Sequence, residues 1–308
     1  MAYRLKRSET PRRGLRRIAR EELDLLAAEL ADPALDPYAR AHQARRRFKR
    51  LRALLRLFRG GLGATFRAED AWYRDAARTL APFRDAEALV ETLTCLLDRD
   101  PALRGAAGVT GLLMRLAHER EVLAETEHLE ERLAALADGV AAARERMAGW
   151  RLRGKGYRAL AEGIERTAGR ARRAFDRALA EGGAEARHAW RREAKYHALH
   201  VELLTGMWPA VLRRYGREVE ELVDLLGAEH NLVLLLALAE AEPPGPGLDA
   251  LREAAQRAQD ALLARAVPLG RRIHAERPAA LRRRFGAYWE IWRLLPDPAQ
   301  RMDDGEGA

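Results

Sequence analysis

Residues 42–58 read HQARRRFKRLRALLRLF, and this stretch decides the fold that the sequence predicts. When successive residues are placed about 100° apart, as in an α-helix, the leucines and phenylalanines fall on one side. Seven cation-capable side chains, including the next arginine along the chain, fall within an arc of about 140° on the other side; they are His42, Arg45, Arg46, Lys49, Arg52, Arg56 and Arg59. The pattern predicts an amphipathic helix whose cationic face points away from its core.

The cationic face of this helix includes no acidic residue. Like charges four residues apart on a helix repel each other by a few tenths of a kcal/mol per pair. An ordinary salt-bridged surface would interleave glutamates, and this one does not. The face is therefore either a solvated basic surface or a site for an anion.

The pattern His-x-x-Arg-Arg-x-x-Lys occurs twice, at residues 42–49 and 188–195, and the two copies begin 146 residues apart (188 minus 42). Lysine is rare here, since only four of the 55 Lys and Arg residues are Lys. Two of those four, Lys49 and Lys195, occupy the same position of the repeat. Because a compact ammonium differs from a planar guanidinium, the repeated lysine indicates a selected residue.

This spacing predicts a duplicated helical unit, with copies at residues 10–150 and 155–295 and a disordered acidic tail at residues 296–308. In each copy a further residue, Asp85 or Asn231, follows the histidine by 43 residues.

The second basic helix has the shorter cationic face. Its cations again share an arc of about 100°; they are His188, Arg191, Arg192 and Lys195. Beyond them, Ala198 stands where the first copy has Arg52, and Glu202 stands where it has Arg56. We therefore expect weaker anion binding by the second face. Other side chains of this helix are expected on the core side; they are Trp190, His197 and His200.

The composition favours an all-α protein. The hydrophobic content is 48%, mostly Ala and Leu, the aromatic content is 6%, and no segment alternates as a strand does. The formal net charge of +9 suggests a polyanion as the partner. The single Cys95 fits a reducing compartment, and we expect a cytoplasmic protein without a signal peptide or membrane span.

Capping signals predict where the helices lie. We expect helices at about residues 11–30, from 37 to a stop at Gly60-Gly61, at 66–80, from a cap at Asp85 to about 98, and at 111–149. In the second copy, helices should begin near Tyr157 and after Gly183, and Asn231 should start a short one. After a loop at residues 243–247, the last two should end near residues 276 and 295.

The duplicated motif resembles that of the CHAD family (conserved histidine α-helical domain) over roughly residues 10–295. The resemblance rests on the two basic helices and on the Arg84-Asp85 pair that follows the first one. It implies two helical bundles related by a pseudo-twofold axis, which flank a basic groove or pore. It also implies binding of inorganic polyphosphate without catalysis. The residues that the resemblance would carry over as phosphate contacts are His42, Arg45, Lys49, Arg52, His188, Arg191 and Lys195; Arg46, Arg56 and Arg192 share these faces and are added on geometry.

Other functions stay open on the sequence alone. Single-stranded nucleic acid is also a polyanion, although its binding usually uses aromatic stacking platforms that the cationic faces lack. A metal-dependent polyphosphate-processing enzyme would need paired carboxylates, whereas the repeat supplies one Asp and one Asn, and Asp85 is better explained as a helix cap. We expect no cofactor, no catalytic residue and no metal site. Expected partners are polyphosphate, polyphosphate-metabolising enzymes and polyphosphate granules.

Overall fold

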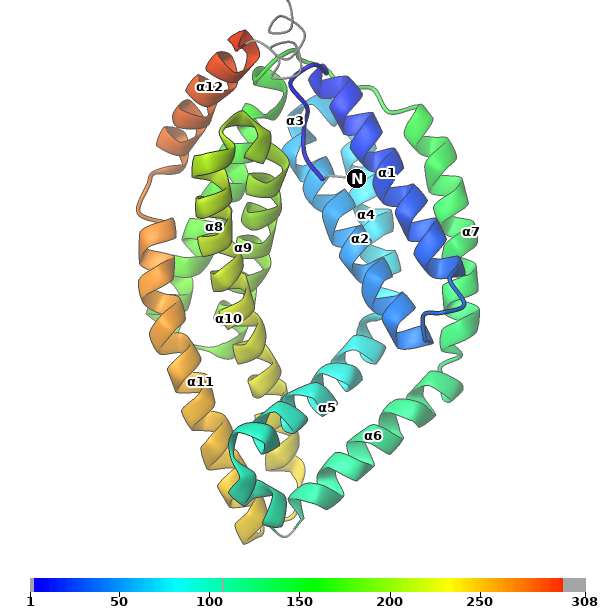
Figure 1. Ribbon diagram of the computed structural model, residues 1–308, viewed down its shortest axis with the longest axis vertical. Coiled ribbons are helices and arrows are strands. Elements are labelled where there is room, and N and C mark those ends of the chain that lie inside the picture. Colours follow the sequence, from blue (N-terminus) through cyan, green and yellow to red (C-terminus); the bar gives the residue numbers. More distant parts are fainter. Residues whose placement is uncertain (1–2, 107, 296–308) are drawn as a thin grey trace, which may run out of the picture.

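A computed structural model describes residues 3–106 and 108–295. In this part of the chain the fold is all-α, with no strand (Figure 1). The expectation for the tail at residues 296–308 lies outside the described residues. The helices up to residue 148 are α1 (Pro11–Ala31), α2 (Pro37–Leu57), α3 (Arg59–Leu62), α4 (Ala64–Thr79), α5 (Ala81–Arg99), α6 (Val109–Thr126) and α7 (Leu129–Ala148). Those that follow are α8 (Arg158–Glu181), α9 (Ala184–Leu204), α10 (Pro209–Ala241), α11 (Pro246–Ile273) and α12 (Pro278–Leu294).

The two halves place their helices in corresponding order. In the first half α1 packs against α2 and α7, and α2 packs against α4. In the second half α8 packs against α9 and α12, and α9 packs against α10. Figure 1 shows these groups as two lobes, with α5 and α6 extending from the first lobe to the lower end of α10 and α11. This order agrees with the offset of the sequence motif, and its origin in a duplication stays a prediction.

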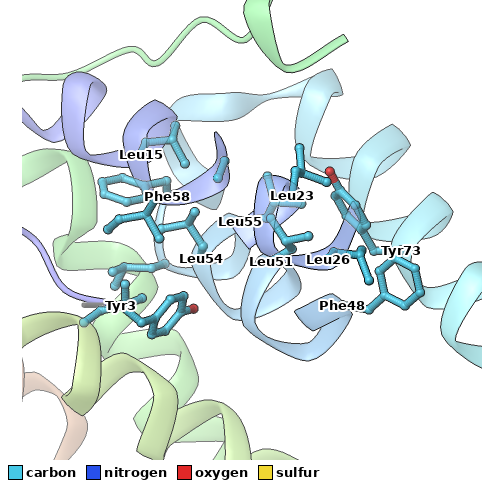
Figure 2. Close-up of a cluster of buried hydrophobic side chains, with 14 of the residues drawn as sticks. Tyr3, Leu15, Leu23, Leu26, Phe48, Leu51, Leu54, Leu55, Phe58 and Tyr73 are labelled. Atoms are coloured by element: carbon cyan, nitrogen blue, oxygen red, sulfur yellow. The ribbon is translucent and has the colours of Figure 1, made fainter. Parts of the chain in front are cut away.

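The basic helix of the first half has the core face that the sequence predicts. Thr10 and Asp36 cap α1 and α2 with their side chains, and a proline follows each cap in the first turn. The apolar side of α2 is fully buried against α1 and α4, and Figure 2 shows Leu51, Leu54 and Phe58 within this cluster. The cationic side of α2 is thereby fixed on the side that faces the second half.

Hydrophobic clusters cross the boundary between the predicted repeats. The largest cluster joins α1, α2, α4 and α7 to residues of α8 and α12, such as Leu160 and Phe285. A second cluster joins α5 and α6 to α10 and α11. A third lies within the second half, where Trp190 is buried as expected and donates through its indole Nε1 to Nε2 of His274 at 3.1 Å. These shared cores hold the two basic helices in a fixed relation.

Several predicted helix boundaries are wrong. Gly60 and Gly61 lie inside the short helix α3, and α2 has already ended at Leu57. The expected helix at residues 111–149 is broken between α6 and α7, where His128 adopts a positive φ of 50°.

Asp85 and Asn231 do not begin helices. Because proline lacks an N–H and is tolerated in a first turn, Pro82 places the start of α5 at Ala81, so Asp85 lies inside that helix. The second half has Ala228 at the position of Pro82, and α10 runs through Asn231 without a break.

Helix α10 corrects the expectation that no apolar run has the length of a membrane span. Among the described residues it is the one helix whose length and composition would allow it to cross a membrane. Its mean hydropathy is 1.7 over a window of 18 residues. This is weak evidence for a membrane, since core helices pass the same test. Here α10 packs against α9, α11 and α5, which accounts for its apolar composition.

Candidate functional site

The two basic helices lie against each other, and one cavity is lined by the cations of the first motif and by Lys195 of the second. The other cations of the second motif do not line it; they are His188, Arg191 and Arg192. Helix α2 packs against α9, and a cavity of about 360 Å³ opens between them, with further walls from α5 and α10. We call this cavity the central cleft. Its basic lining residues are His42, Arg45, Arg46, Lys49, Arg50, Arg84 and Lys195. Its acidic lining residues are Glu202, Glu220 and Asp224.

The repeated lysines meet in the central cleft. The side chains of Lys195 and Lys49 both line the cleft, and they lie close enough to act on each other's pKa. Burial, followed by the charges of Lys195 and Arg45, lowers the pKa of Lys49 to about 6. Burial and the charge of Arg191 also lower the pKa of Lys195, although Asp224 opposes this shift. Two half-buried amines close to each other carry an electrostatic cost that an anion would relieve.

Arginines from three helices surround this lysine pair. Arg45 donates through Nη1 to the carbonyl oxygen of Ala77 at 2.6 Å. Burial lowers the pKa of both Arg45 and Arg191, and Arg84 of α5 adds to both shifts through its charge. Among the described residues, the buried Nε atoms of Arg45 and Arg191 have no hydrogen-bond acceptor. The Nε atoms of Arg40, Arg56 and Arg120 are unpartnered as well, so this feature is not confined to the motif. Since a buried donor without an acceptor is costly, the N–H groups of Arg45 and Arg191 are available to an anion.

The two motif histidines occupy different environments. His42 is exposed beside the cleft, where partial desolvation and the charge of Arg84 lower its pKa. His188 is half-buried, and its Nδ1 lies 3.3 Å from Nδ1 of His230. Burial and the charge of Arg191 lower the pKa of His188. Both rings are thus less readily protonated than free histidine.

Asp85 lies near both motifs, although it caps no helix. Its carboxylate offsets part of the lowering of the pKa of Arg45, Arg191 and His188. An exposed carboxylate that acts on both halves reduces the repulsion among these cations. The interpretation of Asp85 as a helix cap is therefore replaced by that of a shared counter-ion.

The structure does not bring all the predicted contacts into the cleft. Arg52 pairs with Asp70 of α4 at 2.9 Å, and Arg56 lies 3.6 Å from the same carboxylate. Both guanidinium groups also lie over the ring of Tyr196. Arg192 is exposed, and its Nε lies 3.5 Å from its neighbour Glu193. The first cationic face is therefore divided into a free part that lines the cleft and a part neutralised by α4.

Two residues of the cleft were missed by sequence reasoning. Arg84 belongs to the Arg-Asp pair that follows the first motif, but nothing local shows that α5 directs it at the lysine pair. Arg50 lies about 40° outside the cationic arc, one helical step beyond Arg46. The structure pairs its guanidinium with Glu22 at 3.3 Å and Glu202 at 2.7 Å, and helical periodicity gave no signal for it.

The described part of the chain contains no group of three or more His, Cys, Asp or Glu side chains that could hold a metal ion. Of the acidic residues in the cleft, Glu202 is occupied by Arg50, and Asp224 acts on Lys195. The arrangement can hold an anion by charge and by directed N–H donors.

Comparison with known families defines the class of protein. The family model named CHAD domain matches residues 17–240, a range that includes both basic helices and the central cleft. The chain belongs to the CHAD domain family. No curated protein matches the chain.

Proposed function

We propose that the chain binds inorganic polyphosphate in the central cleft and does not convert it. The observation that carries this proposal is the proximity of Lys49 and Lys195, one from each motif, in a cleft that four arginines also line. Six Lys and Arg side chains line the cleft against three carboxylates. A ligand with several closely spaced negative charges would offset this excess.

The chemistry of the donors fits phosphate. Arginine offers fork-like N–H donors to phosphate oxygens, and lysine offers a compact charge. The unpartnered Nε atoms of Arg45 and Arg191 are donors of this kind, one from each basic helix. A chain of phosphates would contact both helices at once, which a single carboxylate would not do.

Single-stranded nucleic acid is the second candidate, and the lining of the cleft argues against it. Sequence-tolerant binding of single strands uses aromatic side chains as stacking platforms. Among the described residues that line the central cleft, none is aromatic. A ligand with phosphates and no bases therefore suits the cleft better.

Catalysis by a metal-dependent mechanism is less favoured than binding. Such a mechanism needs carboxylates that hold the metal. In the described part of the chain the carboxylates of the cleft form no such group, and the motif positions supply cations. We propose that polyphosphate-metabolising enzymes act as separate partners of this protein in the cytoplasm or on polyphosphate granules.

The experiment that tests this function is a titration with long-chain polyphosphate and, at the same salt, with single-stranded RNA. We expect tighter binding of polyphosphate, with a loss of at least about tenfold in affinity between about 50 and 200 mM salt. Equal or tighter binding of RNA would favour the nucleic-acid function. An affinity for polyphosphate that does not change with salt would contradict a site built from several ion contacts.

A further inference from the structure

A second basic cavity adjoins the central cleft. It has a volume of about 420 Å³ and lies between the N-terminal segment, α2, α9 and the first turns of α10. The two cavities share four lining residues and therefore adjoin each other; these are Arg50, Ala198, Glu202 and Glu220. We call this second cavity the outer groove.

The outer groove contributes three cations of its own. Arg4, Arg213 and Arg217 line it, and all three are exposed. Arg213 and Arg217 lie four residues apart on α10, a spacing at which like charges repel. Within residues 3–106 and 108–295, neither of these two guanidinium groups forms an ion pair or a hydrogen bond. Their charge is therefore available to a ligand.

A small residue lies on the wall that the two cavities share. Ala198 lies on the shared wall, at the repeat position where the first half has Arg52. The long side chain of an arginine at this position would extend into the junction between the two cavities. At the same place Arg50 pairs with Glu202 at 2.7 Å and offsets that carboxylate. The departure of the second motif at Ala198 thus places a small side chain where the two cavities adjoin.

We propose that the outer groove is a second phosphate subsite, which holds the continuation of a polyphosphate chain that is bound in the central cleft. This subsite rests on the proposed function of the cleft. The ligand class is a linear polyanion longer than the cleft, because only such a ligand reaches Arg213 and Arg217 while it contacts Lys49 and Lys195. The affinity of the protein then depends on chain length through these arginines.

The test compares two probes on the intact chain, inorganic tripolyphosphate and long-chain polyphosphate. In Arg213→Glu with Arg217→Glu we expect the affinity for long chains to fall at least about tenfold, from lost ion contacts. The affinity for tripolyphosphate should change less than about twofold at physiological salt, because exposed charges are screened beyond about 8 Å. The matched control is Arg271→Glu with Arg272→Glu, an exposed pair on α11 outside both cavities. This control variant should lose little affinity for either probe.

Equal losses on both probes, or no loss on long chains, would overturn the subsite while the function of the cleft stands. A loss in the control as large as in the α10 variant would also overturn it, because binding would then follow net charge alone. If the wild-type protein bound neither probe, the proposed function itself would fail. Circular dichroism of both variants checks that the helices remain intact.

Discussion

Replacement of Lys49 by methionine should stabilise the folded protein at neutral pH. Burial and the neighbouring charges lower the pKa of this amine from 10.5 in the unfolded chain to about 6. Between these values the unfolded chain binds more protons than the folded one, so the Lys49 contribution to stability rises with pH. At pH 7 the solution is 3.5 pH units below the unfolded pKa of the amine (10.5 minus 7). At about 1.36 kcal/mol per unit, Lys49 therefore destabilises the folded protein by at most about 5 kcal/mol at this pH.

Methionine has a similar length and removes this cost, although it also removes the polar interaction of Lys49 with Lys195. We therefore expect Lys49→Met to raise the free energy of unfolding at pH 7 by about 3–4 kcal/mol. The gain should shrink by about 3 kcal/mol between pH 7 and pH 9, since the wild-type penalty falls over those two pH units. The assay is urea unfolding of both proteins at the two pH values.

Lys155→Met is the matched control, because Lys155 is an exposed lysine between α7 and α8. Its substitution should change the free energy of unfolding by less than about 0.5 kcal/mol at either pH. A gain for Lys49→Met that does not change between pH 7 and pH 9 would refute the reasoning, because the effect would then come from packing. A loss of stability at pH 7 would refute it as well.

Four further predictions concern binding, catalysis and the contact between the halves. Binding of polyphosphate should raise the pKa of Lys49 and Lys195, so that the complex takes up roughly one proton near pH 7. Calorimetry in buffers of different ionisation enthalpy measures this proton uptake, and an uptake of zero would contradict the prediction. Affinity for polyphosphate should accordingly increase as the pH falls from about 8 to 6, and a flat profile would count against a titrating lysine pair. Incubation with polyphosphate, Mg²⁺ and nucleotides should leave the chain length unchanged, and shortening that disappears in Asp85→Ala would show that Asp85 is catalytic. His200→Ala should lower the free energy of unfolding by about 2–4 kcal/mol, because the buried ring joins α9 to the Ala53 carbonyl oxygen of α2 at 2.9 Å; an unchanged urea midpoint would refute this.

The sequence was sufficient for the helices whose signals are local. The Asp36-Pro37 cap and the apolar side of residues 48–58 predict α2 and its buried face, because both depend on contacts within a few turns. Burial of His197 and His200 on the core side of α9 is confirmed for the same reason. The stop at Gly60-Gly61 was wrong, because α3 continues through both glycines.

The composition of the site depends on contacts that no local pattern contains. Lys49 and Lys195 come together because α2 packs against α9. That packing depends on a hydrophobic cluster whose residues come from distant parts of the sequence. Arg52 and Arg56 share the helical arc of Lys49, yet Asp70 on another helix neutralises them. Helical periodicity places a side chain on a face, and tertiary packing decides which part of that face remains free.

The central claim is that the lysine pair binds polyphosphate through its position rather than through net charge. The most direct measurement is the affinity of Lys49→Met with Lys195→Met for long-chain polyphosphate, compared with that of Arg271→Glu with Arg272→Glu. The methionine variant changes the formal charge by two and the control by four, so diffuse electrostatics predicts the greater loss in the control. The structure predicts the reverse, with at least about a tenfold loss in the folded methionine variant and little loss in the control. A greater loss in the control would contradict the claim.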